Sequence, residues 1–177
     1  HNAVARPLSN LRSKGVETRH IAAPLFDSSA ILEEFRNAFD RERVDLVVCI
    51  HVSNVFGFVL PVMEIAKICA EHRVPMVVDA SQSAGCISID AERESGLFWC
   101  MPGHKGLHGP QGTGILLLPE DGPELPPLLY GGTGSDSASP AMPELSPPSA
   151  SIFWAWNRAV RVFSRAFCAL RRSVMSR

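Results

Sequence analysis

An aspartate and a lysine are the side chains of this sequence whose surroundings best suit chemistry. Asp79 ends the short apolar run Pro75-Met-Val-Val-Asp79, a pattern typical of a buried strand with the acid at its carboxyl end. Lys105 lies on the glycine-flanked loop Gly103-His104-Lys105-Gly106. In open α/β sheets, ligands bind outside the carboxyl ends of the strands. A lysine that can form a Schiff base and an acid that can pair with a pyridine nitrogen suit a pyridine-ring cofactor.

The elements that must position this pair alternate along the chain. Apolar periodicity predicts helices over residues 2–12, from Asp27 or Ser28 to Phe39, and from Pro61 to about His72, and strands over Val16–Ala22, Asp45–Val52 and Met76–Ala80. Pro7 predicts a late start or a kink in the first helix. The alternation with short connections predicts an α/β fold, with a mostly parallel sheet and helices on both faces.

The pattern changes after Ile89, because no helix candidate separates the next two strands. Leu97–Met101 and Gly114–Leu118 are strand candidates joined by the Lys105 loop, and we expect one of them to be antiparallel. Residues 119–150 contain eight prolines and many Gly and Ser residues, which is typical of a loop or linker.

Further motifs accompany the acid and the lysine in a fixed order. Gln82 follows Asp79, GPQGTG follows Lys105, and the stretches HNAV with RPL at the start and HVSN with Gly57 lie upstream. In this order and spacing, roughly the first 135 residues resemble the class V aminotransferase and cysteine desulfurase family, which are fold-type I pyridoxal 5'-phosphate enzymes. The resemblance implies part of a large cofactor-binding domain, pyridoxal 5'-phosphate as cofactor, an amino-acid substrate and a homodimer in the full-length enzyme.

The resemblance also implies roles for single residues. Lys105 would form the internal aldimine, Asp79 would pair with the pyridine nitrogen, and Gln82 would reach the ring hydroxyl or the aldimine. Taken alone, each has a structural alternative: an exposed loop lysine, an acid that caps a turn, and an ordinary loop amide.

Four more residues complete the expected site. Asn54 would contact the ring hydroxyl and His104 the phosphate, while His1 would stack on the ring. Thr133, in the stretch GGTG, would reach the phosphate in the partner subunit, and a flexible glycine-rich linker is the alternative. His104 and His108 are four apart, but the glycines around them disfavour a helix, so we expect no metal site.

Composition limits the kinds of partner and the cellular location that the sequence suggests. Before residue 151 the chain carries 11 basic and 18 acidic residues, a net charge of −7, which gives no reason to expect nucleic-acid binding. The sequence shows neither a signal peptide nor an apolar run of spanning length, and four of its five cysteines lie in apolar runs, which predicts a cytoplasmic protein with reduced thiols.

The sequence thus divides into a partial large domain over 1–135, a Pro/Ser-rich linker over 136–150 and a basic tail over 151–177. Helical spacing would place the apolar residues of the tail on one stripe and its arginines opposite. A helix packed on the domain, a frame-shifted tail, and a helix for a membrane surface or partner all remain open, the last being the least favoured.

The sequence departs from the family at three points. Pro102 stands where a phosphate-binding Ser or Thr is expected, and the family's phosphate loop would lie before residue 1. The substrate-binding arginine and the desulfurase cysteine belong to a downstream region. We therefore expect a fragment that is inactive alone and binds the cofactor weakly, with a non-catalytic remnant or association module as the alternative function. These residues do not distinguish between desulfurase, aminotransferase and lyase activity.

Overall fold

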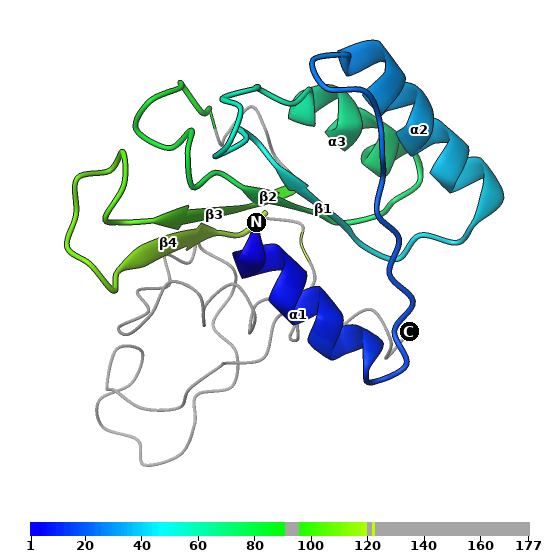
Figure 1. Ribbon diagram of the computed structural model, residues 1–177, viewed down its shortest axis with the longest axis horizontal. Helices are drawn as coiled ribbons and strands as arrows, with labels where there is room; N and C mark the ends of the chain where they lie inside the picture. The colour runs from blue at the N-terminus through cyan, green and yellow to red at the C-terminus, as the bar shows by residue number, and fades with distance from the viewer. Residues whose placement is uncertain (91–95, 120–121, 123–177) are drawn as a thin grey trace.

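The computed structural model describes residues 1–90, 96–119 and 122. Figure 1 shows a twisted sheet with helices on both sides. Its elements, in chain order, are α1 (Asn2–Arg12), α2 (Ser28–Arg41), β1 (Val47–Ile50), α3 (Val62–Glu71), β2 (Met76–Asp79), β3 (Leu97–Pro102) and β4 (Gly114–Leu117). Every helix among the described residues is too short or too polar to cross a bilayer.

The four strands form one sheet in the order β1-β2-β3-β4. β1, β2 and β3 are parallel, and β4 runs antiparallel to β3 after the Lys105 loop. The register sets Ile50, Asp79 and Cys100 side by side near the carboxyl ends of the three parallel strands. The predicted α/β fold, its mostly parallel sheet and the single antiparallel strand are confirmed.

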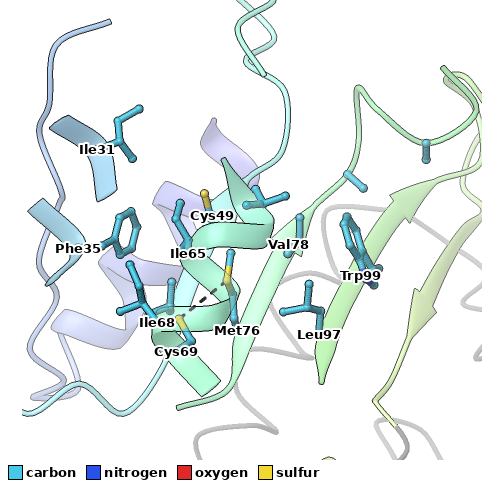
Figure 2. Packing of buried hydrophobic residues seen from close by; sticks show 14 residues of the cluster. Ile31, Phe35, Cys49, Ile65, Ile68, Cys69, Met76, Val78, Leu97 and Trp99 are labelled. Atoms are coloured by element: carbon cyan, nitrogen blue, oxygen red, sulfur yellow. Dashed lines mark hydrogen bonds between the residues drawn. The ribbon is translucent and has the colours of Figure 1, made fainter. Parts of the chain in front are cut away.

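One face of the sheet, here the α2/α3 face, carries the main core. Figure 2 shows side chains of α2 and α3 packed over those of β1, β2 and β3, with the Sγ atom of Cys69 3.9 Å from the Sδ atom of Met76. Ile65, Met76 and Val78 are completely buried there. Removing this apolar area from water supplies most of the stability of the domain.

The opposite face, here the α1 face, has a smaller core. Its buried cluster consists of Val77, Phe98, Cys100 and Leu116, and Val4 of α1 packs against it. Helices therefore cover both faces, as predicted, but they cover them unequally (Figure 1).

One predicted strand is wrong, and the predicted helix over residues 2–12 is confirmed without the late start. Val16–Ala22 is not a strand, because no described strand lies beside it and its Ile21 packs instead on the core of the α2/α3 face. α1 does not start late, because it begins at Asn2 and continues through Pro7, which is buried together with Leu11.

The helix start predicted at Asp27 or Ser28 is confirmed. Asp27 is the N-cap of α2, and its Oδ1 accepts a hydrogen bond from the Ala30 N–H at 2.9 Å. α2 continues two residues beyond the predicted end at Phe39, to Arg41. The predicted linker over 136–150 and the predicted tail over 151–177 lie outside the described residues.

Candidate functional site

Asp79 is a buried acid at the carboxyl end of β2. Only 1% of its surface is exposed. Side chains alternate along a strand, so Asp79 lies on the same face as Val77, the α1 face. Its Oδ1 accepts a hydrogen bond from the Ser81 N–H at 3.0 Å.

Asp79 has no cationic partner within the described part of the chain. The ion pairs found there join Arg19 to Glu42 and Arg43 to Asp45. A buried carboxylate is costly unless a positive charge or hydrogen-bond donors compensate it. The position is therefore suited to a ligand that brings a cationic N–H group to this face.

A buried thiol lies next to Asp79 on the neighbouring strand. Cys100 pairs with Asp79 in the β2–β3 register, and burial first, then the negative charge of Asp79, raises the pKa of this thiol. Burial likewise raises the pKa of Cys49 and of Cys69 to about 12. These three thiols stay protonated at neutral pH, so none of them is a ready nucleophile.

The Lys105 loop is held by its own backbone. The Gly103 N–H donates to the Thr113 carbonyl at 2.8 Å, and the Gly109 N–H donates to the Gly103 carbonyl at 2.7 Å. Lys105 is half-buried, whereas His104 beside it is exposed. Lys105 therefore lies on a loop that is held closed by backbone hydrogen bonds.

The structure brings the turn after Asp79 into contact with the Lys105 loop. A Cβ atom placed on Gly85 would lie 2.1 Å from the carbonyl oxygen of Gly106, so the two backbones touch. Gln82, in the turn after Asp79, is half-buried. Asp79, Gln82, His104 and Lys105 therefore belong to two loops that pack on each other.

His1 and Asn54 are placed less tightly. His1 is the exposed N-cap of α1, and its Nδ1 accepts from the Ala3 N–H at 3.1 Å, three residues before Val4 packs on the α1 face. Asn54 is exposed on the loop after β1, where the Ser53 hydroxyl accepts from two backbone N–H groups. Thr133 lies outside the described residues.

Two buried polar side chains escaped the sequence analysis. His51 and Trp99 meet edge to face with their ring centres 5.7 Å apart, and neither His51 Nδ1 nor Trp99 Nε1 has a hydrogen-bond partner among the described residues. Burial lowers the pKa of His51. His51 continues the alternation of Val47 and Cys49, so this pair lies on the α2/α3 face, away from Asp79. In the sequence, only the apolar residues next to His51 and Trp99 could have indicated that these two side chains are buried.

The fold and the paired loops define an α/β protein with a lysine and a buried acid at the carboxyl edge of a mostly parallel sheet. The model of the family described as Aminotransferase class-V matches residues 1–147, and the chain belongs to that family. The resemblance inferred from the motifs is thereby confirmed.

Curated relatives are cysteine desulfurases. The chain is 37% identical over 135 residues to a probable cysteine desulfurase of Methanothermobacter thermautotrophicus, an alignment that covers 75% of this chain and 33% of the relative. It is 34% identical over 133 residues to the mitochondrial cysteine desulfurase of Arabidopsis thaliana, covering 75% of this chain and 29% of the relative. The chain thus spans about a third of the length of these relatives.

Solved structures support the fold. The apo cysteine desulfurase of Thermococcus onnurineus NA1 aligns with a TM-score of 0.62 at 24% identity, over 97% of this chain and 42% of that chain. A structure described as SspA in complex with cysteine aligns with the same TM-score at 22% identity, over 98% of this chain and 45% of that chain. At these identities the likeness concerns the fold.

Proposed function

We propose that this chain is the central cofactor-binding part of a pyridoxal 5'-phosphate enzyme of the cysteine desulfurase type, which acts on an amino acid. The observation that carries the proposal is a buried carboxylate, Asp79, without a cationic partner in the described part of the chain, on a turn that packs against the Lys105 loop. The relatives named above support the class of reaction.

The described residues fit this cofactor. When bound, pyridoxal 5'-phosphate supplies a protonated pyridine ring that withdraws electrons from the substrate's α-carbon. Asp79 would accept a hydrogen bond from the ring nitrogen and hold its proton there. Lys105 would bind the cofactor covalently through Nζ and, once displaced by substrate, would take a proton from the α-carbon. Gln82, in the same turn as Asp79, would donate to the ring hydroxyl.

The outer contacts come from four other residues. We assign ring stacking to His1, because α1 covers the face on which Asp79 lies. We assign a ring-hydroxyl contact to Asn54, a phosphate contact to His104, and a contact with the partner subunit's cofactor to Thr133. Asn54 is exposed on its loop, so this assignment requires the β1 loop to close over the ring.

The proposed activity, substrate and homodimer concern an enzyme longer than this chain. Since the chain spans about a third of its curated relatives, activity, substrate and the homodimer are proposals for a longer protein. Cys49, Cys69 and Cys100 are buried as free thiols, which supports the proposed cytoplasmic location.

Absorbance tests the lysine assignment. Adding pyridoxal 5'-phosphate to the 177-residue chain should produce a band near the visible edge that is absent from Lys105→Ala. Lys67→Ala, on α3, is the matched control and should keep the band. Identical spectra for the wild type and Lys105→Ala would refute the assignment.

Association without chemistry is a second candidate function. Large apolar side chains are exposed on two neighbouring loops, including Phe26 at 63%, Val55 at 73% and Phe56 at 54%. Phe26 and Phe58 link these loops, with ring centres 5.2 Å apart. Exposed apolar patches mark association surfaces. Sedimentation velocity decides the point, because a monomer at all concentrations that binds no cofactor would exclude both functions.

A further inference from the structure

Two glycines far apart in the chain touch through their backbones. A Cβ atom on Gly85 would lie 2.1 Å from the carbonyl oxygen of Gly106. Conversely, a Cβ atom on Gly106 would lie 2.3 Å from the carbonyl oxygen of Ala84. Real Cβ atoms essentially never approach another heavy atom closer than 3.0 Å. The contact is therefore reciprocal, and neither position has room for any side chain.

Backbone conformation alone does not explain both glycines. Gly85 has a φ of +81°, which favours glycine in any case. Gly106 is not among the residues with positive φ, so its φ alone does not favour glycine. What Gly106 requires is space, because the Ala84 carbonyl and the Cys86 Sγ occupy the volume that its side chain would fill.

Each glycine belongs to a hydrogen-bonded turn that carries two side chains of the proposed site. The turn after β2 starts at Asp79 and continues with the Ala84 N–H donating to the Ala80 carbonyl at 2.9 Å. In the other loop, the His108 N–H donates to the Lys105 carbonyl at 2.9 Å. The glycine contact thus joins two internally braced units, one holding the acid and the other holding the lysine.

We propose that Gly85 and Gly106 are positioning residues that fix the Lys105 loop against the Asp79 turn, so that the amine and the carboxylate meet one ligand. This inference rests on the proposed function. Reactions of bound groups are sensitive to misplacement on the scale of 1 Å. A methyl group at either glycine must part the two backbones, because its nearest contacts are main-chain atoms that cannot rotate away.

Hydrogen exchange tests the contact without any cofactor. Gly85→Ala should speed exchange of the His108 and Gly109 amides, in the other loop, on the order of tenfold. Gly15→Ala is the matched control, since Gly15 has the same φ of +81° but no neighbour within 4 Å. Unchanged exchange at His108 and Gly109 would overturn the proposal.

A second variant covers the case in which Gly85→Ala does not fold. Gly106→Ala adds a methyl group at a residue without positive φ, and it should speed exchange of the Ala84 and Cys86 amides across the contact. Normal exchange at both amides in folded Gly106→Ala would equally overturn the proposal.

Borohydride trapping tests the consequence for the lysine. After incubation with pyridoxal 5'-phosphate and reduction, peptide mapping gives the labelled fraction at Lys105 relative to Lys14 and Lys67. We expect the preference for Lys105 in the wild type to fall in Gly106→Ala on the order of tenfold to a hundredfold. A retained preference would remove the positioning role and leave the proposed function standing.

The two proposals can fail separately. No preference for Lys105 in the wild type would refute the proposed function, and the exchange of the His108 and Gly109 amides would still decide whether Gly85 and Gly106 join the two turns. Faster exchange with an unchanged preference for Lys105 would show a purely structural contact and would overturn the positioning role.

Discussion

The two faces of the sheet differ in what they bury. The α2/α3 face buries apolar side chains from two helices and three strands, with completely buried residues such as Ile65 and Val78. The α1 face buries a cluster of four residues and, beside it, the carboxylate of Asp79. One face thus holds most of the apolar core, and the other holds a buried acid beside a smaller cluster. The difference shows how one sheet can concentrate its apolar core on one face and keep a buried carboxylate on the other.

Truncating a core residue on each face tests this difference most strongly. Ile65→Ala should destabilise the chain by roughly 3–5 kcal/mol, because the truncated side chain would leave a cavity that the packed residues around it fill only in part. Leu116→Ala should cost roughly 2–3 kcal/mol, because the smaller cluster on the α1 face can collapse further. Urea unfolding measures the loss of stability in both variants. A larger loss for Leu116→Ala than for Ile65→Ala would contradict the conclusion that the α2/α3 face carries the main core.

Alkaline pH probes the buried thiols on the α2/α3 face. Burial raises the pKa of Cys49 from 9.0 to about 12, so the folded chain keeps a proton that the unfolded chain loses above pH 9.0. The stabilisation is complete below pH 9.0 and is lost at about 1.4 kcal/mol per pH unit for each such thiol as the pH approaches the folded value.

Urea unfolding between about pH 8 and about pH 10.5 measures this loss. Cys49→Ala should lower stability near neutral pH but reduce the alkaline slope. A slope equal to that of the wild type would show that Cys49 is not buried as a protonated thiol.

The smallest effect concerns binding of the cofactor's phosphate. Pro102 has no hydroxyl to donate, and the Gly103 N–H already donates to the Thr113 carbonyl, which leaves His104 as the phosphate contact in this loop. Each missing charge-assisted hydrogen bond would have contributed roughly 1.5–3 kcal/mol. Pyridoxal and pyridoxal 5'-phosphate should therefore bind with affinities within about threefold of each other. A hundredfold preference for the phosphorylated form would reveal a phosphate site elsewhere in the chain.

Sequence patterns predicted most of the fold because the elements follow simple periodicities. The apolar stripe of α2 and the continuous apolar runs of β1 and β2 are local signals that burial then confirms. The strand predicted over Val16–Ala22 is absent although Ile21 packs on the core, because a strand needs a neighbour that local sequence does not specify.

The candidate site was only partly predictable, for the same reason. The positions of Asp79 at the end of β2 and of Lys105 after β3 follow from strand ends and turn residues. The contact between Gly85 and Gly106 is a long-range backbone contact, and glycine in a sequence does not distinguish a need for φ from a need for space. The edge-to-face pair of His51 and Trp99 depends on register between strands that are not adjacent, which periodicity does not encode.

The most direct test of a site shared by Asp79 and Lys105 is the affinity of Asp79→Asn for pyridoxal 5'-phosphate. Asparagine keeps the shape and the acceptor for the Ser81 N–H but removes the negative charge. Absorbance titration should show binding weakened on the order of tenfold to a hundredfold, while Asp45→Asn, a surface control, binds as the wild type does. Equal affinities for Asp79→Asn and the wild type would contradict the claim that Asp79 and Lys105 serve one ligand.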